Sequence, residues 1–201
     1  MLLPPNTGGD FVLTPAGTHL ATCYRIVDLG TQQNEYQGKV KRQHKILLSW
    51  ELPNELMDDG RPFSQNQRYT YSSNEKSRLR QDLEAWRGVP FTDADFGVFD
   101  LSNILGKSCF LTILHEPKGG STYANIKAIV KLPKGTAVPV LVNKTVDFDI
   151  EHFDQAVFST FSESLRNTIM ASPEYQERGR HPDAGPPASE DPSDGADDIP
   201  F

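Results

Sequence analysis

The chain has 201 residues, of which 27 are acidic and 20 basic, and 37% are hydrophobic. This composition suits a water-soluble protein with one core of ordinary size, since domains usually take about 100 to 200 residues. A net charge of -7 argues at first against a nucleic-acid partner, because proteins that hold phosphates usually carry excess Lys and Arg. No stretch approaches the roughly 18 uncharged apolar residues of a membrane helix.

The first ten residues, Met1–Asp10, show neither the basic start nor the long apolar run of a secretory signal. We therefore expect a cytoplasmic protein without a membrane partner. Two cysteines, Cys23 and Cys109, are too few for a disulfide framework and have no C-x-x-C neighbour. We expect both thiols to be reduced and buried in the core.

The composition changes near the end of the sequence. The segment Pro182–Phe201 carries six acids, five prolines and no base. Such a segment cannot bury enough apolar surface to offset the entropy of ordering it, so residues 182–201 are expected to form a disordered acidic tail. The other 181 residues hold 21 acids against 20 bases, so the folded part is close to neutral.

Three strands are expected in the first half of the chain. Apolar, aromatic and β-branched residues predict them at 19–29, 45–52 and 65–72. The first strand is expected to end at Gly30 and the second at Pro53. The polar segment between these two strands is either a loop or the extended end of a hairpin.

A helix and a hairpin follow in the sequence. Ser72 and Glu75 form a capping-box pattern, and the apolar residues after them recur at helical spacing up to Gly88, which is placed for a left-handed cap. Residues 108–116 and 123–132 predict a fourth and a fifth strand, joined by a flexible turn.

Alternation along the strands predicts which side chains face inward. In the second strand Trp50 shares a face with Ile46 and Leu48, which favours a place in the core over a role as a stacking platform. In the fifth strand one face is small and apolar up to Val130. The other face is aromatic, polar and basic, with Tyr123, Asn125, Lys127, Ile129 and Lys131.

Three strands, a helix and a β-hairpin is the element order of the OB-fold, a five-stranded Greek-key barrel. We therefore expect a mainly β fold, with an OB-fold domain in residues 1–137. Residues 138–181 predict two short amphipathic helices, with Ser162 as an N-cap and Pro173 beyond the end. We expect this helical extension to pack on the barrel; a homo-oligomer contact or a clamp over a bound strand is the alternative.

The bases of the folded part gather in two windows. Residues 36–50 hold four bases and no acid, and residues 107–134 hold five lysines against one acid. Single-stranded nucleic acid needs a basic groove for its backbone and aromatic faces for its bases, so both windows are candidate contacts. The alternative is a solvated hairpin. The candidate DNA-binding residues are Arg25, Tyr36, Lys39, Lys41, Arg42, Lys45, Tyr69, Tyr71, Lys118, Tyr123, Asn125 and Lys127.

The last five residues carry the most specific signal. They combine acidic charge, a rigid proline and an aromatic residue, which a partner protein can bind in an apolar pocket with a basic rim. The residues of this tip are Asp197, Asp198, Ile199, Pro200 and Phe201. Behind an acidic tail, the tip resembles that of bacterial and phage single-stranded-DNA-binding proteins. Residues 15–135 also resemble phage-encoded members of this class.

This resemblance implies an OB-fold, binding of single-stranded DNA and no enzymatic activity. It implies further that the protein protects single strands during DNA replication, recombination and repair, and recruits polymerase, helicase, primase or recombinase through its tip. The acidic tail is also long enough to compete with DNA for the basic groove. An adaptor or decoy that binds host replication proteins through the tip, without coating DNA, is the alternative.

We expect no cofactor, no metal and no catalytic residues. The five histidines show no metal-binding spacing, and Lys118 precedes its glycines instead of following them as in a P-loop. Asp93 and Asp95, like Asp147 and Asp149, are paired aspartates that are more typical of helix caps and turns than of a nuclease metal site.

Overall fold

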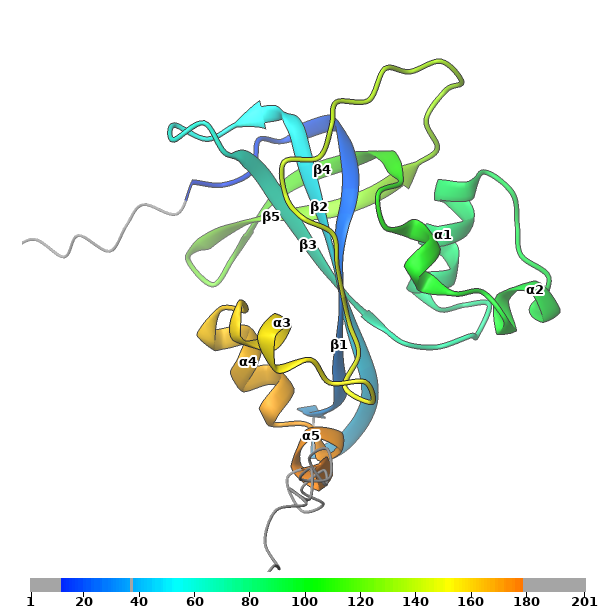
Figure 1. Cartoon of the computed structure of the whole chain (residues 1–201), viewed down its shortest axis with the longest axis vertical. Helices are drawn as coiled ribbons and strands as arrows, with labels where there is room; N and C mark the ends of the chain where they lie inside the picture. The colour runs from blue at the N-terminus through cyan, green and yellow to red at the C-terminus, as the bar shows by residue number, and fades with distance from the viewer. Residues whose placement is uncertain (1–11, 37, 179–201) are drawn as a thin grey trace, which may run out of the picture.

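The computed structural model describes residues 12–36 and 38–178, which are built around one sheet with short helices beside it (Figure 1). The strands are β1 (Gly17–Tyr36), β2 (Lys39–Leu56), β3 (Pro62–Thr70), β4 (Ser108–Lys118), β5 (Ser121–Val130) and β6 (Val146–Phe148). Their order is β3-β2-β1-β4-β5, with antiparallel neighbours, while the short β6 pairs in parallel with β1. The prediction of a mainly β fold is confirmed.

β1 and β2 extend well beyond the predicted strands. The β1–β2 ladder continues past Gly30, after a register shift, and reaches the pair of Tyr36 with Lys39. The polar segment is therefore the end of a long two-stranded hairpin. We call this end, residues 30–36 and 39–45, the hairpin arm. Gly30 has a φ of 66°, and a Cβ there would lie 2.6 Å from the Cβ of Ser172. Pro53 lies within β2, where the β2–β3 ladder is irregular.

The inner face of the curved sheet encloses a first hydrophobic cluster, covered by helix α1 (Arg78–Arg87). Trp50 is fully buried in this cluster, with its ring centroid 5.9 Å from that of Trp86, so the prediction of a core side chain is confirmed. Cys23 and Cys109 are buried free thiols in the same cluster, as expected. Burial raises the pKa of Cys23 to about 12.

Helix α1 begins later than its capping-box pattern predicts. Its N-cap is Ser77, whose side chain accepts a hydrogen bond from the backbone N–H of Arg80. Ser72 and Asn74 instead accept from backbone N–H groups two residues further on, and these local turns delay the helix. Gly88 has a left-handed φ of 76° and ends the helix as predicted.

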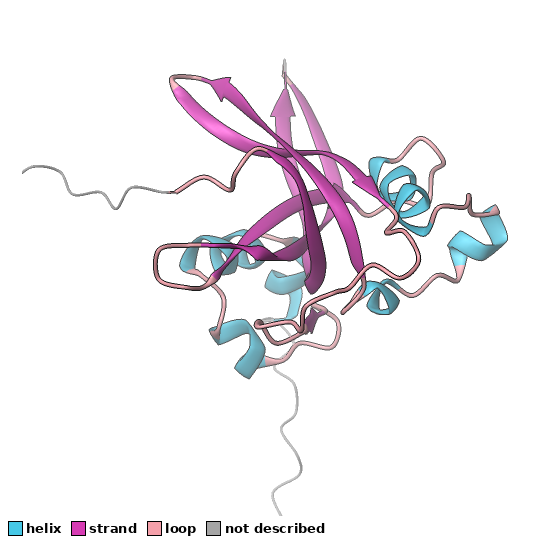
Figure 2. Ribbon diagram, turned by 90° about the horizontal axis from the view of Figure 1, so that it is seen from above, coloured by secondary structure: helices cyan, strands magenta, loops and turns pink. Residues whose placement is uncertain are grey.

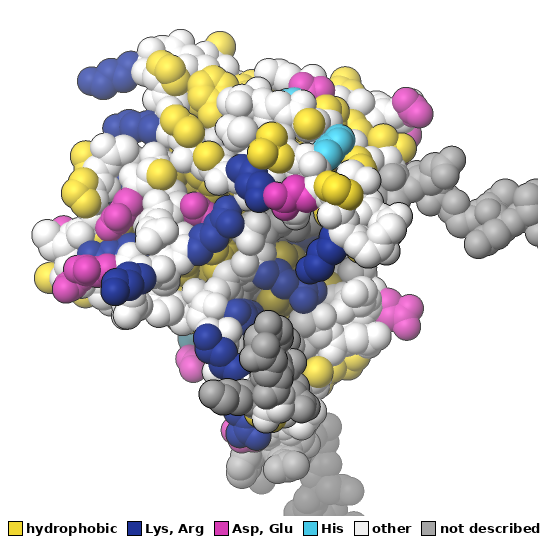
Figure 3. Space-filling model, turned by 180° about the vertical axis from the view of Figure 1, so that it is seen from behind, with side chains coloured by type: hydrophobic (Ala, Val, Ile, Leu, Met, Phe, Trp, Pro, Cys, Tyr) yellow, Lys and Arg dark blue, Asp and Glu magenta, His cyan; other side chains and the backbone are white. Residues whose placement is uncertain are grey.

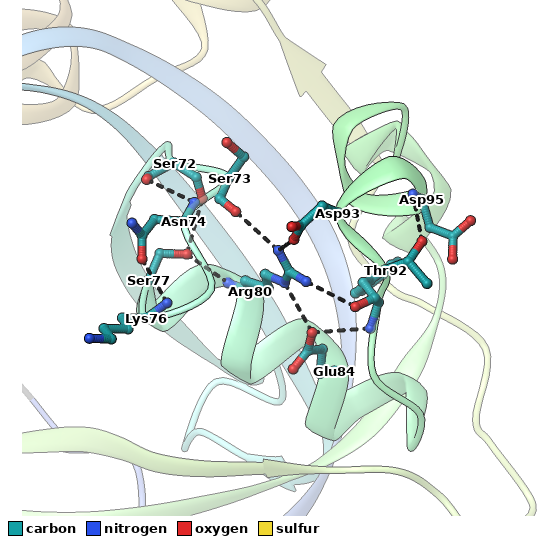
Figure 4. Close-up of polar contacts among 11 residues, drawn as sticks. Ser72, Ser73, Asn74, Lys76, Ser77, Arg80, Glu84, Thr92, Asp93 and Asp95 are labelled. Atoms are coloured by element: carbon teal, nitrogen blue, oxygen red, sulfur yellow. Dashed lines mark hydrogen bonds and ion pairs between the residues drawn. The ribbon is translucent and has the colours of Figure 1, made fainter.

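Arg80 fixes the loop that follows α1 (Figure 4). Its buried guanidinium donates to Glu84 Oε1 at 3.1 Å, to Asp93 Oδ1 at 2.6 Å and to the carbonyl oxygen of Phe91 at 2.9 Å. Two carboxylates thus compensate one buried charge. Asp93 begins the short helix α2 (Asp93–Gly97), so this aspartate holds a loop in place. The sequence analysis did not single out Arg80.

The residues after β5 form an extension whose helices lie on the outer face of the hairpin arm, while Asp147, Asp149 and Glu151, in and after its strand, line a cavity on the inner side. The extension contains β6 and the helices α3 (Gln155–Ser159), α4 (Glu163–Met170) and α5 (Pro173–Arg178), on the side of the sheet away from α1 (Figures 1 and 2). Ser162 caps α4 as predicted. Pro173, however, begins α5, since the first turn of a helix needs no N–H from it. A second hydrophobic cluster joins extension and sheet: Val27, Leu29, Leu47, Phe148, Ile150, Phe158, Phe161, Leu165 and Ile169.

The sheet is open between β3 and β5. Within the described ranges no backbone ladder joins these strands, and the sheet is therefore not the closed five-stranded barrel that the sequence predicts. Side chains bridge the opening instead. Gln65 Nε2 in β3 donates to the carbonyl oxygen of Ala124 in β5 at 2.7 Å, and Arg78 in α1 donates to that of Ile126 at 2.8 Å.

An irregularity in the β4–β5 ladder changes the faces of β5. Thr112 is paired with Ala128 and the next residue with Ile126, so Lys127 is an additional residue in the strand. The alternation shifts at this point. Ile129 is 3% exposed and lies in the core, whereas Val130 is 48% exposed, which reverses the prediction for both.

No helix among the residues described here has the length and apolar composition needed to cross a membrane.

Candidate nucleic-acid interface

The register of β1, β2 and β3 separates an inner from an outer face. Ile46, Leu48 and Trp50 of β2 point inward to the first cluster, while Leu47 contacts the second cluster on the outer side. Residues paired across the ladders share a face, so Arg25, Ser49 and Asn66 form one outward row. We call the open part of this outer surface the basic face. It consists of Arg25, Lys41, Lys45, Asn66, Arg68 and Thr70, with the buried Ser49 beneath Arg25.

Arg25 is oriented by neutral partners at the centre of the basic face. Its Nε donates to Ser49 Oγ at 3.0 Å and its Nη2 to Asn66 Oδ1 at 3.4 Å. Its guanidinium carbon lies 5.5 Å from the ring centroid of Tyr24. These contacts orient the guanidinium without cancelling its charge. Such a group is suited to a phosphate or to the face of a base.

Lys45 and Lys41 place two positive charges close together on the hairpin arm. Lys45 Nζ donates to Thr70 Oγ1 at 2.7 Å and to Gln43 Oε1 at 3.0 Å. The pKa of Lys45 is lowered, first by partial burial and then by the charge of Lys41. A bound anion would relieve this repulsion.

Arg42 alternates with Lys41 and so points to the other side of the arm. Its Nε donates to Gln33 Oε1 of the paired strand at 3.4 Å. The structure therefore does not bring Arg42 to the basic face, although the sequence groups it with its neighbours.

Arg68 is a member of the basic face that the sequence analysis missed. It is exposed on β3 and paired in the ladder with Leu47. Within residues 12–36 and 38–178 no carboxylate forms an ion pair with it. Alternation along β3, counted from the inward Tyr69, is the signal that identifies Arg68 and Asn66 as outward residues.

The second basic window forms the β4–β5 hairpin, which the Gln65–Ala124 hydrogen bond sets beside β3. Tyr123 is 50% exposed on this hairpin, and Lys118 near its turn is also exposed. Both side chains are accessible to a strand that lies across β3. They remain candidates for the interface.

Asn125 and Lys127 are already engaged by Glu116 of the paired strand. Asn125 Nδ2 donates to Glu116 Oε2 at 2.6 Å, and Lys127 forms an ion pair with the same carboxylate. Both contacts, first that of Lys127, lower the pKa of Glu116. The charge of Lys127 is therefore largely cancelled, and the two residues contribute less to an anion site than their sequence suggests.

Tyr69 is buried, which contradicts its prediction as a DNA contact. It is 2% exposed, and its hydroxyl donates to Asp82 Oδ2 at 2.8 Å. Burial, with the neighbouring carboxylate, raises its pKa far above the ordinary value. A ring in this position cannot stack on a base, so this prediction is wrong.

Tyr71 is 56% exposed but lies on the inner side of the arm, with its ring centroid 5.5 Å from that of His44. Both rings line a cavity of about 340 Å³. The carboxylates that line this cavity are Asp28, Asp100, Asp147, Asp149 and Glu151. Such surroundings repel phosphate, and the structure does not bring Tyr71 to the basic face.

Two sets of candidate residues lie outside the described side chains. The backbones of Tyr36 and Lys39 pair at the end of the arm, but their side chains are not described. The tip is likewise outside the described ranges, with Asp197, Asp198, Ile199, Pro200 and Phe201.

Glu51 marks where the extension starts to cover the outer face. Its carboxylate is fully buried and accepts from the backbone N–H of Val142 at 3.0 Å and that of Asn143 at 2.8 Å. The side-chain amide of Asn143 also donates to it, at 2.6 Å. Three donors replace water around the charge and hold the connection from β5 to β6 against the sheet.

The arrangement leaves a hollow beside the basic face. The β4–β5 hairpin and helices α3 and α4 lie on the same side of the hairpin arm (Figures 1 and 2). Seen from behind, Lys and Arg side chains gather in a hollow between lobes of the molecule (Figure 3). Within the described ranges, no group of three or more His, Cys, Asp or Glu side chains is placed to hold a metal ion.

A scan against models of known protein families finds no match to this chain, and a search of the curated proteins finds no similar sequence. The functional inference therefore rests on the geometry and charge of the two faces of the sheet, together with the sequence.

Proposed function

We propose that this protein binds single-stranded DNA along the basic face, without strong sequence preference and without catalysing a reaction. One observation carries the proposal, namely the separation of charge across a single sheet. Arg25, Lys41, Lys45 and Arg68 lie on the outer side, whereas five carboxylates surround the cavity on the inner side. A phosphate backbone is attracted to the first side and repelled from the second.

Flat side chains beside these charges offer surfaces for the bases. The exposed ring of Tyr123 and the guanidinium groups of Arg25 and Arg68 can each stack on a base, and base–aromatic stacking is worth about 1–3 kcal/mol. A duplex hides the faces of its bases within its own stack. Stacking therefore favours single strands.

The proposed fold is an OB-fold whose barrel is closed by side chains. The strand path β3-β2-β1-β4-β5, with α1 between β3 and β4, agrees with the element order of that fold. The Gln65–Ala124 hydrogen bond lies where a closed barrel would join its two edge strands. OB-folds bind oligonucleotides on the face of their second and third strands, and apart from Arg25 of β1 the basic face lies on these strands here.

The acidic tail supports a role in recruitment. We propose that the protein coats single strands during DNA replication, recombination and repair in the cytoplasm of a bacterial or phage-infected cell, as a phage-encoded protein able to form homo-oligomers. Its tip, Asp197–Phe201, would bind a polymerase, helicase, primase or recombinase through an apolar pocket with a basic rim.

Fluorescence anisotropy with a labelled dT oligomer of about 30 nucleotides, and with a duplex of equal length, tests the proposal. The dT oligomer should bind at least about tenfold more tightly than the duplex, since only its bases are free to stack. Between about 50 and 200 mM salt, four phosphate contacts should give log affinity against log salt a slope of about −3.

A matched pair of variants locates the interface. Arg68→Glu should weaken binding of the dT oligomer about tenfold or more, whereas Lys76→Glu, an equal charge change in the loop before α1, should leave it within about twofold. Equal affinity for single strand and duplex overturns the proposal. No affinity for DNA, with capture of replication proteins through the tip, would support the adaptor or decoy function.

A further inference from the structure

An apolar cavity of about 360 Å³ lies at the C-terminal end of α1 and shares no residue with the basic face. It is formed by α1, the segment from α1 to the start of β4, and the residues directly after β5. Its apolar walls are Leu83, Trp86, Phe91, Phe99, Ile104 and Leu132. Cavities of this size, apolar with a few polar groups, are typical ligand sites.

The walls of the cavity are held in place before any ligand binds. Trp86 Nε1 donates to the carbonyl oxygen of Ser108 at 2.9 Å, and the backbone N–H of Phe91 donates to Glu84 Oε1 at 3.0 Å. The rings of Phe91 and Phe99 pack edge to face, with centroids 5.0 Å apart. A ligand would therefore bind with little ordering of the walls.

The rim of the cavity is basic. Arg87, Lys107 and Lys131 line it together with the apolar walls, and no acidic residue does. Arg87 lies over the ring of Phe91, with its guanidinium carbon 4.6 Å from the centroid. In the part of the chain that the structure describes, Lys107 and Lys131 form no ion pair with a carboxylate. The rim thus has two uncompensated charges beside an apolar hollow.

We propose that this cavity binds the C-terminal tip of the same chain, Asp197–Phe201. The apolar walls fit Ile199 and Phe201, and the basic rim fits the two aspartates that precede them. The apolar part of the tip therefore matches the walls, and its acidic part matches the rim. The basic face offers cations, whereas this cavity offers cations and apolar walls together, so the cavity fits the tip better.

The length of the chain allows this contact within one molecule. Residues 179–201 follow α5, and a segment of this length spans up to roughly 75 Å when extended. A compact domain of about 180 residues has a radius of gyration of about 16 Å. The inference goes beyond the proposed function, because it concerns a peptide site that needs no DNA.

Direct peptide binding tests the inference. A labelled peptide of residues 192–201 is titrated against the full chain carrying Phe201→Ala, which leaves the cavity free. Lys107→Glu and Lys131→Glu in this chain should each weaken peptide binding about tenfold, because they reverse charges of the rim. Lys134→Glu, an exposed lysine outside the cavity, is the matched control and should leave it within about twofold.

Occupancy by the chain's own tip is tested in the same titration. The chain with Phe201 intact should bind the added peptide at least about fivefold more weakly than Phe201→Ala, since its own tip competes at high effective concentration. Equal affinity overturns occupancy within one molecule, and no effect of the rim variants overturns the site. Displacement of the peptide by the dT oligomer would place the tip on the basic face, and this result would also overturn the proposed tip site in the cavity. Failure of the dT oligomer to bind leaves the peptide result intact.

Discussion

Two halves of the same outer face differ in chemistry and in what covers them. Val27 and Leu47 face each other across the β1–β2 ladder and are buried by the extension, while Arg25, only two positions away, stays partly exposed above the buried Ser49. Both halves belong to the same antiparallel ladder. The side chains therefore decide which part of an exposed sheet becomes a core and which remains available to a ligand.

The largest effect on stability is expected from a substitution in the half of the outer face that the extension covers. Phe148 is buried, and its ring centroid lies 5.1 Å from that of Phe161 and 5.3 Å from that of Phe153. Phe148→Ala should lower the free energy of unfolding by about 3–5 kcal/mol, measured by urea denaturation. The exposed Val140→Ala is the control and should change it by less than about 0.5 kcal/mol. A loss below about 1 kcal/mol for Phe148→Ala would show that the extension does not stabilise the sheet.

The next effect concerns the boundary between the halves. Glu51→Ala removes the acceptor of three N–H groups, so it should cost about 2 kcal/mol of unfolding free energy. Hydrogen exchange at the backbone amides of Val142 and Asn143 should accelerate, because local detachment then exposes them to water. Unchanged exchange at both amides would contradict the proposed anchoring role.

The open half is tested with two exposed tyrosines on opposite sides of the sheet. Tyr123→Ala should weaken dT binding by about 1–2 kcal/mol, and Tyr123→Phe should retain it, because stacking needs the ring and not the hydroxyl. Tyr71→Ala, next to the acidic cavity, is the matched control and should leave the affinity within about twofold. Equal losses for Tyr71→Ala and Tyr123→Ala would mean that the two sides are not distinguished by DNA.

The smallest effect is a pH dependence at the joint between arm and extension. His44 Nε2 lies 2.6 Å from Asp28 Oδ1, and Glu174 and Asp149 also face it. The hydrogen bond to Asp28 raises the pKa of His44 despite partial burial. The stabilisation is complete below the ordinary histidine pKa and is lost as pH rises through the raised value.

Raising the pH from about 6 to about 8.5 should therefore lower the free energy of unfolding, by less than about 1 kcal/mol because His44 is partly exposed. His44→Gln should remove this part of the pH dependence in denaturant titrations. If the free energy of unfolding of the variant depends on pH as steeply as that of the unmodified chain, another group is responsible.

The sequence predicts the number of long strands and the inner face of β2 because these strands alternate apolar and polar residues. Trp50 is placed correctly on that basis. For the hairpin arm the sequence leaves a loop and a hairpin end as alternatives, since a ribbon with two polar sides carries no such alternation. The reversed faces of Ile129 and Val130 depend on one additional residue in β5, which no local pattern reveals.

The charge pattern alone reveals the two basic windows, but the residues of the basic face follow only from the register between strands. Arg68 and Asn66 join Arg25 only once β3 is aligned with β2. Tyr71 lies on the same inner side as Tyr69, and the acidic cavity beside it is built by segments far apart in the sequence, so the pattern of β3 alone does not reveal it. Glu51 gave no sequence signal, because its partner Val142 is 91 residues further along the chain.

The position of β6 has a consequence for how copies of this protein behave towards one another. β4 pairs with β1 only from Gly17 to Thr22, and β6 then pairs with β1 from Arg25 to Val27. Without β6, the hydrogen-bonding groups of this edge and the apolar Leu29 and Leu47 would be open to strands of another copy. A version shortened to residues 1–137 is therefore expected to aggregate edge to edge, so a fragment intended for DNA-binding experiments must keep the extension.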